Sequence, residues 1–239
     1  MVDNLTKALL ENNTLVIFLN LVDLLENEQP QCDITDDFRR KMHVSVNGFF
    51  RQLKDNPASL HPELSSLADL NLPMYLSGAS FGGGMVAEHA CMFPDTWSGY
   101  SSLNGSLASL NDRFKFDPSQ NVGCLKQRFL AAVNFYDNRV PMLKSILFNE
   151  AIEKCGNGDL IQTYCNTHPF ALNSSEPSLT GHSWSDNQED FSSYLKMLLL
   201  FMAGEKDDEA KKTFQRAELL ARANHESATF CLLYTSRCV

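Results

Sequence analysis

Blocks of apolar and polar residues divide the first part of the chain into segments of helix and strand length. Residues 14–21 form a nearly continuous apolar run, TLVIFLNL, which predicts a strand buried on both faces. Residues 36–54 carry apolar side chains at helical spacing after an acidic start, so they predict a helix. Residues 3–12 predict a shorter helix with leucines along one side.

The same alternation continues as far as residue 103. Residues 73–77 predict a second strand, residues 82–93 a helix that Pro94 ends, and residues 97–103 a third strand. Helix and strand thus alternate, which predicts parallel strands joined by helical crossovers. The predicted fold class is α/β, and a sheet of this kind binds ligands at the carboxyl ends of its strands.

The second half of the chain has a different pattern. Residues 129–148, FLAAVNFYDNRVPMLKSILF, are apolar and aromatic with Pro141 inside, so they predict two helices. The wider block 111–190 predicts a helical cap inserted over the sheet. Its aromatic side chains are expected to pack on the sheet or, alternatively, to line an apolar substrate tunnel. Residues 197–203, MLLLFMA, predict a strand that ends in an acidic turn at residues 204–207.

The main chemical signal lies between the second predicted strand and the helix after it. The segment Gly78-Ala79-Ser80-Phe81-Gly82 has the pattern Gly-x-Ser-x-Gly, typical of a nucleophile elbow that raises a serine hydroxyl above the end of a sheet. Gly78 and Gly82 are expected where a Cβ would collide with the tightly folded backbone. The helix that begins near Phe81 would direct its N–H groups and positive dipole end toward an anion over Ser80.

Composition narrows the function classes. The 239 residues carry a net charge of −9, and no basic stripe offers contacts to nucleic acid phosphates. No apolar run reaches the length of a membrane span, and the start of the chain lacks signal-peptide features, so a cytoplasmic location is the default expectation. The seven cysteines are scattered and predict reduced thiols, although Cys155 and Cys165 could pair in an exported protein. No metal cluster or phosphate loop is recognised, so no cofactor is expected.

Residues 5–230 resemble the α/β-hydrolase fold, and within it the group of monoacylglycerol lipases and lysophospholipases. The resemblance is strongest over residues 36–107, where a helix precedes LPMYLSGASFGG and then AEHACMFPDTWSGYSSLNGS. Members of the group continue with a helical cap, Gly-x-x-Asp and His-Glu, which match residues 204–207 and His225-Glu226 here. The resemblance implies a triad of Ser80 as nucleophile, Asp207 as orienting acid and His225 as base, with the Phe81 backbone N–H as an oxyanion donor.

The implied function is hydrolysis of carboxylic esters, lipid-like ones such as monoacylglycerols or lysophospholipids, through an acyl-serine intermediate. A relative that cleaves peptide or amide bonds is an alternative on the same scaffold. The rival hypothesis is a catalytically incomplete fragment or a binding protein, because the group carries earlier strands and a His-Gly loop that are not found in this sequence. Residues 231–239 resemble a translated sequencing adapter and are kept out of fold arguments.

The triad depends on the geometry of residues 207–224, which are rich in helix-forming residues. One continuous helix would hold Asp207 and His225 about 27 Å apart, whereas a break near residues 216–218 would let them meet. Rival acids and other histidines also remain open. The rival acids are Asp112, Glu205 and Asp208. His43 is expected to pack or lie at the surface, and His89 to lie about 13 Å along the next helix from Ser80, too far for a direct hydrogen bond. His168 and His182 are expected in the cap, where a loop role is expected for His182 and a substrate contact is the alternative.

Overall fold

The computed structural model describes residue 11 and residues 36–66, 73–108, 117–167 and 188–235. The chain divides into two compact units, Met1–Met74 and Tyr75–Val239. The predicted helix 3–12 and strand 14–21 lie outside the described residues, apart from residue 11. No helix within the described ranges combines the length and the apolar character needed to cross a membrane.

Among its described residues, the first unit contains the long helix α3 (Asp36–Asp55), which confirms the prediction for residues 36–54. Two aspartates lie in its first turn, at the positive end of the helix dipole, and Lys54 lies in its last turn, at the negative end. One face of α3 is buried, with the residues Arg39, Met42, His43, Val46, Asn47, Phe50 and Leu53. Two short 3-10 helices follow, η1 (Pro57–Ser59) and η2 (Pro62–Ser66).

The second unit is built on a sheet of four parallel strands in the order β1-β2-β3-β4. The strands are β1 (Tyr75–Ala79), β2 (Gly99–Leu103), β3 (Arg128–Asn134) and β4 (Ile161–Asn166). All of β2 and nearly all of β3 are buried, because helices cover both faces of the sheet. The fold class is therefore α/β, as the alternation of helix and strand predicts.

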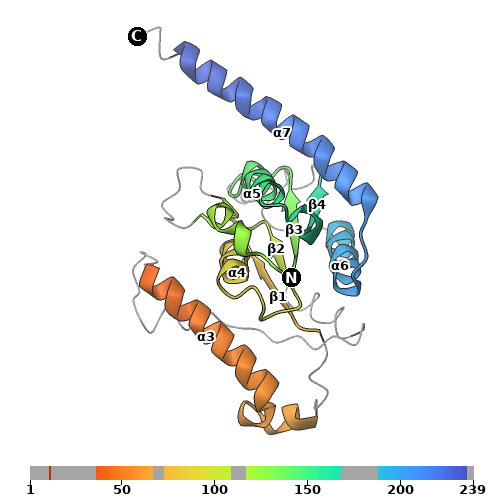
Figure 1. Cartoon of the computed structure of the whole chain (residues 1–239). Coiled ribbons are helices and arrows are strands. Elements are labelled where there is room, and N and C mark those ends of the chain that lie inside the picture. The colour runs from red at the N-terminus through yellow and green to blue at the C-terminus, as the bar shows by residue number, and fades with distance from the viewer. Residues whose placement is uncertain (1–10, 12–35, 67–72, 109–116, 168–187, 236–239) are drawn as a thin grey trace. The chain divides into compact units, whose positions relative to one another are not determined.

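Within the described part of the second unit, the helices beside this sheet are α4 (Phe81–Met92), α5 (Leu143–Lys154), α6 (Gln188–Ala203) and α7 (Asp208–Thr235). Figure 1 shows α4 and α5 on one side of the sheet and α6 on the other. The short 3-10 helices η3 (Pro118–Gln120), η4 (Val122–Cys124) and η5 (Gly158–Leu160) lie in the connections. The core contains large, fully buried side chains from the sheet and from helices α5 and α6: Tyr100, Phe129, Leu130, Ile146, Phe148, Ile152 and Phe201.

The prediction of two helices over residues 129–148 is wrong in its first half. Residues 128–134 form β3, a central strand paired with both β2 and β4, and only residues 143–154 form a helix. A strand buried on both faces is apolar throughout, so its sequence has no period that separates it from a buried helix. Because β3 and β4 belong to the sheet, these parts of the block 111–190 are not a helical cap.

The prediction of a strand at residues 197–203 is also wrong. These residues are the last two turns of α6, which begins at Gln188. The buried side chains on this helix are Tyr194, Met197, Leu198 and Phe201, spaced as one face of a helix requires. The helical period cannot be recognised within residues 197–203 alone. The half-buried positions there are also apolar, so no polar residue marks the outer side of the helix.

Replacing Phe201 by alanine is expected to lower the free energy of unfolding by about 3–5 kcal/mol, as for other large buried aromatic side chains. Phe201 is 0% exposed, packs edge-on against the Tyr75 ring at a centroid distance of 5.9 Å, and lies 5.1 Å from the Arg128 guanidinium carbon. Urea unfolding measures the loss. Leu219→Ala on α7, where the side chain is 70% exposed, is the control and should change stability by less than about 0.5 kcal/mol. Equal losses in both variants would contradict this packing.

Candidate active site

The turn from β1 into α4 has the geometry of a nucleophile elbow. Strand β1 ends at Ala79, helix α4 begins at Phe81, and Ser80 between them has φ 52° and ψ −120°. A positive φ is rare for a residue with a side chain, and strain of this kind collects at functional sites. The Ser80 N–H donates to the Leu103 carbonyl at 2.8 Å, which ties the turn to the end of β2.

Close backbone approach explains the glycine before the serine. A Cβ on Gly78 would overlap the Gly82 carbonyl, and backbone atoms cannot move aside as a flexible side chain can. The expectation for Gly82 is wrong, because a Cβ there would meet nothing within 4 Å. The second position that requires glycine is Gly83, one residue later. A Cβ there would lie 2.6 Å from Ser102 Oγ and 2.8 Å from Gly105 Cα. Helix α4 therefore packs directly against the chain that leaves β2.

The carboxyl ends of the strands bring further polar residues to the same edge as Ser80. Asn104 follows β2 with φ 48°, is 3% exposed, and donates its N–H to Ala132 O at 2.8 Å. Its side-chain Oδ1 accepts from the Asn134 N–H at 2.8 Å, at the end of β3. Asn104 thus links the chain that holds the elbow to the turn after β3.

That turn carries a buried carboxylate, Asp137, which the sequence analysis did not consider. Asp137 is 5% exposed, and its N–H donates to Asn134 O at 3.1 Å. Its Oδ1 accepts from the backbone N–H groups of Arg139 at 2.8 Å and Val140 at 2.9 Å. These bonds hold the carboxylate in one position at the carboxyl edge of the sheet. The sequence does contain a sign of this acid, because Asp137 directly follows an apolar run and precedes Val140-Pro141. The sign is missed when residues 129–148 are interpreted as helical.

The spacing of the strands suits Asp137 to a role with Ser80. Neighbouring strands lie about 4.8 Å apart, so the ends of β1 and β3 are about 10 Å apart. An imidazole that accepts from a serine hydroxyl and donates to a carboxylate, each over about 2.8 Å, spans most of this distance. A histidine ring between the two side chains could therefore contact both.

The structure does not bring Asp207 and His225 together. Asp207 caps α7, because its Oδ1 accepts from the N–H groups of Glu209 and Ala210, both at 3.0 Å. Helix α7 runs without a break from Asp208 to Thr235, so the break near residues 216–218 is not found. At about 1.5 Å of rise per residue, the backbones at 207 and 225 are about 27 Å apart along one helix. The helix also continues into the adapter-like residues after 230.

The remaining candidates are placed as follows. Asp208 is the first residue of α7 and Glu205 is exposed in the turn before it, whereas Asp112, His168 and His182 lie outside the described residues. His89 is 1% exposed in α4, and its Nε2 accepts from the Trp97 indole at 3.1 Å, so it packs in the core. His43 is 1% exposed in the first unit.

A buried lysine lies near the elbow helix. Lys144, in the first turn of α5, is 5% exposed and donates from Nζ to Ser106 Oγ at 2.9 Å. A Cβ on Gly84, one turn into α4, would lie 2.9 Å from the Ser106 carbonyl oxygen. Burial lowers the pKa of the Lys144 ammonium. This edge of the sheet therefore also holds Ser106, whose hydroxyl accepts a hydrogen bond from a buried lysine.

Phe81 is the first residue of α4, where N–H groups have no carbonyl acceptor within the helix. Its role as an oxyanion donor stays a prediction. Among the described residues, no group of three His, Cys, Asp or Glu side chains is arranged to hold a metal ion.

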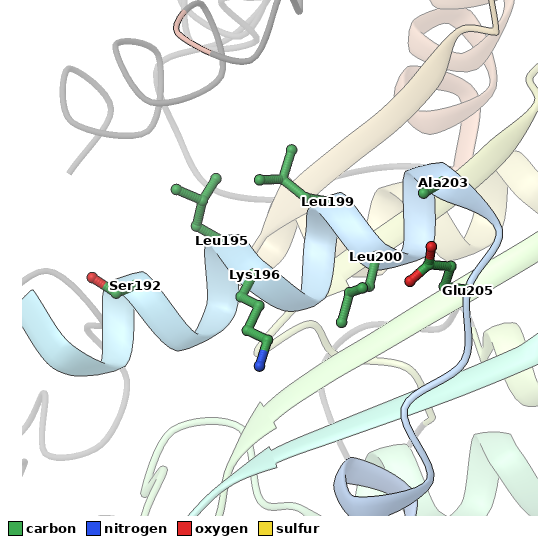
Figure 2. Close-up of a pocket in the computed structure, with 7 residues that line it drawn as sticks. All are labelled: Ser192, Leu195, Lys196, Leu199, Leu200, Ala203 and Glu205. Carbon is green, nitrogen blue, oxygen red and sulfur yellow. The ribbon is translucent and has the colours of Figure 1, made fainter.

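A shallow pocket lies along α6 (Figure 2). It is lined by Ser192, Leu195, Lys196, Leu199, Leu200, Ala203 and Glu205. None of these residues belongs to the elbow or to the turns after β2 and β3. The candidate active site is therefore the edge that carries Ser80, and this pocket is a separate surface feature.

No family model matches this sequence, and no curated protein matches it. Many solved structures, among them the following three, are similar to part of this chain. A protein described as a dienelactone hydrolase from Klebsiella pneumoniae is 14% identical with a TM-score of 0.43, over 54% of this chain and 51% of that one. The monoacylglycerol lipase of Paleococcus ferrophilus is 12% identical with a TM-score of 0.42, over 59% and 72%.

The acylaminoacyl peptidase of Pyrococcus horikoshii is 15% identical with a TM-score of 0.45, over 65% of this chain and 27% of that one. This chain spans about half the length of the dienelactone hydrolase and about a quarter of the peptidase. The function proposed below rests on the geometry around Ser80 rather than on these matches.

Proposed function

We propose that the chain is a serine hydrolase that cleaves carboxylic esters through an acyl-serine intermediate at Ser80. The observation that carries the proposal is the backbone of Ser80, which has a positive φ at a strand-to-helix turn on the carboxyl edge of a parallel sheet. Strain at a serine in this position is the mark of a nucleophile elbow.

The proposed reaction has two steps. A histidine takes the proton from Ser80 Oγ as the oxygen attacks the ester carbonyl, and N–H groups at the start of α4 stabilise the oxyanion. The histidine then gives its proton to the leaving alcohol. Water, activated by the same histidine, releases the acid and restores the serine hydroxyl.

We propose Asp137 as the carboxylate that orients this histidine, because it is buried at the same edge, two strands from Ser80. The base is one of His168, His182 and His225. Asp207, the acid implied by family resemblance, has instead the position of a helix cap. Lipid-like esters such as monoacylglycerols remain the proposed substrates, on the resemblance alone.

Labelling with a fluorophosphonate serine probe tests the nucleophile. The wild-type chain is expected to be labelled at one site, and Ser80→Ala should remove the label. Ser106→Ala is the matched control, because Ser106 lies at the same edge and its hydroxyl accepts a hydrogen bond from Lys144, and it should keep the label. Loss of label in Ser106→Ala but not in Ser80→Ala would overturn the proposal.

The same assay assigns the base. Alanine variants of His168, His182 and His225 are compared, and one of the three is expected to lower the labelling rate by a factor of about 10³ or more, since an unactivated serine hydroxyl is a weak nucleophile. Circular dichroism confirms that each variant is folded. Labelling rates equal to the wild-type rate in all three variants would exclude these three histidines as the base and favour the hypothesis of an incomplete fragment.

A further inference from the structure

Two exposed cysteines lie in neighbouring segments of the second unit. Cys124 is the last residue of η4, just before β3, and Cys155 directly follows α5. Both thiols are free and exposed, whereas Cys91 and Cys165 are free and buried. The exposed pair is therefore open to small reagents in solution.

Contacts on both sides of Cys124 bring it to the segment of Cys155. A Cβ on Gly123 would lie 3.6 Å from Cys155 Sγ, so the Cys155 side chain points at η4. One residue after Cys124, the Leu125 carbonyl accepts from Asn157 Nδ2 at 3.2 Å. Consecutive Cα atoms are about 3.8 Å apart, so Cys124 lies within one residue of both contacts. A disulfide requires Cα atoms about 4.4–6.8 Å apart, which a small adjustment of exposed turns can provide.

We propose that Cys124 and Cys155 form a reversible disulfide when the chain meets a small-molecule disulfide such as oxidised glutathione. One cysteine thiolate attacks the glutathione disulfide, forms a mixed disulfide and releases one reduced glutathione. The second cysteine thiolate then attacks the protein sulfur of the mixed disulfide and releases the second glutathione. The two cysteines lose two electrons and two protons, and oxidised glutathione becomes two reduced molecules.

The two buried cysteines are poor competitors for this reaction. Burial raises the pKa of Cys91 and of Cys165 to about 12, so neither thiol forms much of the reactive thiolate near neutral pH. Cys165 Sγ also packs against Met142 Sδ at 3.9 Å inside the core. The pairing of Cys155 with Cys165 that the sequence allowed is not found, since both are free and only Cys155 is exposed.

The cross-link would close a loop from residue 124 to residue 155. This loop contains β3, α5 and the turn that carries Asp137. A disulfide across a loop of this length restricts the unfolded chain, so oxidation should raise the melting temperature by about 5 °C or more. The redox state would thus set the stability of the segment that forms the centre of the sheet. This inference does not depend on the proposed hydrolase activity.

The test treats the full chain with millimolar oxidised glutathione and maps its peptides without reduction. The expected product is a peptide pair joined through Cys124 and Cys155, together with a rise in melting temperature that dithiothreitol reverses. Cys124→Ser and Cys155→Ser should each abolish the cross-link and the rise. Cys91→Ala is the control and should keep both.

Three results would overturn the proposal. One is that Cys124 and Cys155 each carry a separate glutathione adduct with no cross-link. Another is that either cysteine is joined to a different cysteine of the chain. The third is that the rise in melting temperature persists in Cys155→Ser.

Discussion

Replacing Ser80 by glycine is expected to stabilise the chain by about 1 kcal/mol while abolishing ester hydrolysis. Ser80 has φ 52° and ψ −120°, a backbone conformation that costs a residue with a Cβ about 1–3 kcal/mol and that glycine adopts without strain. Part of the gain is offset because glycine loses more conformational freedom on folding. A stabilised but inactive variant is the result expected if the strain serves catalysis.

Ser80→Ala is the matched variant, because alanine removes the hydroxyl and keeps the Cβ. Its kcat for a chromogenic ester should fall by about 10⁶, as for other catalytic serines, without the gain in stability. Urea unfolding and initial-rate assays on the same preparations measure both quantities. Full activity in either variant, or equal stability of the glycine and alanine variants, would contradict the assigned role of this turn.

Replacing Asp137 by asparagine is expected to lower kcat by about 10⁴, because an orienting amide favours the wrong histidine tautomer. Asparagine keeps an Oδ1 that can accept from the N–H groups of Arg139 and Val140, so the turn should stay folded. Initial rates with a saturating chromogenic ester report the loss in kcat.

Asp207→Ala provides the opposite pattern. It removes the cap that binds the N–H groups of Glu209 and Ala210, so it should cost about 1 kcal/mol of stability and change kcat little. Comparing the two variants therefore tests whether Asp137, at the carboxyl edge of the sheet, or Asp207, the acid implied by family resemblance, is the orienting acid. A large loss of kcat in Asp207→Ala with none in Asp137→Asn would reverse the assignment.

Local pattern was sufficient where a segment has a clear period or distinct ends. The acidic start and helical spacing of residues 36–54 predicted α3, and Pro94 correctly placed the end of α4. Gly-x-Ser-x-Gly predicted the elbow, because Gly78 and Ser80 occupy backbone positions that few other residues tolerate.

Local pattern failed where a segment is apolar on more than one side, because the polar positions that would mark its period are then missing. Arg128–Asn134 and Gln188–Ala203 both contain runs of apolar residues, yet one is a central strand and the other a helix. The two segments differ in the elements that surround them. Strand β3 pairs with β2 and β4, whereas α6 has a half-buried side that lines a pocket. Because residues 129–148 were interpreted as helical, the acid at the end of β3 was overlooked.

The sequence by itself determined the α/β class and the serine at the turn, since both depend on residues within a few positions of one another. The tertiary structure decided which acid lies at the same edge of the sheet as that serine. Strand order brings Asp137 to the edge that carries Ser80, and the unbroken helix α7 separates Asp207 from His225. The physical reason is that a catalytic group needs proximity in space, and proximity between distant residues is set by strand pairing and helix length.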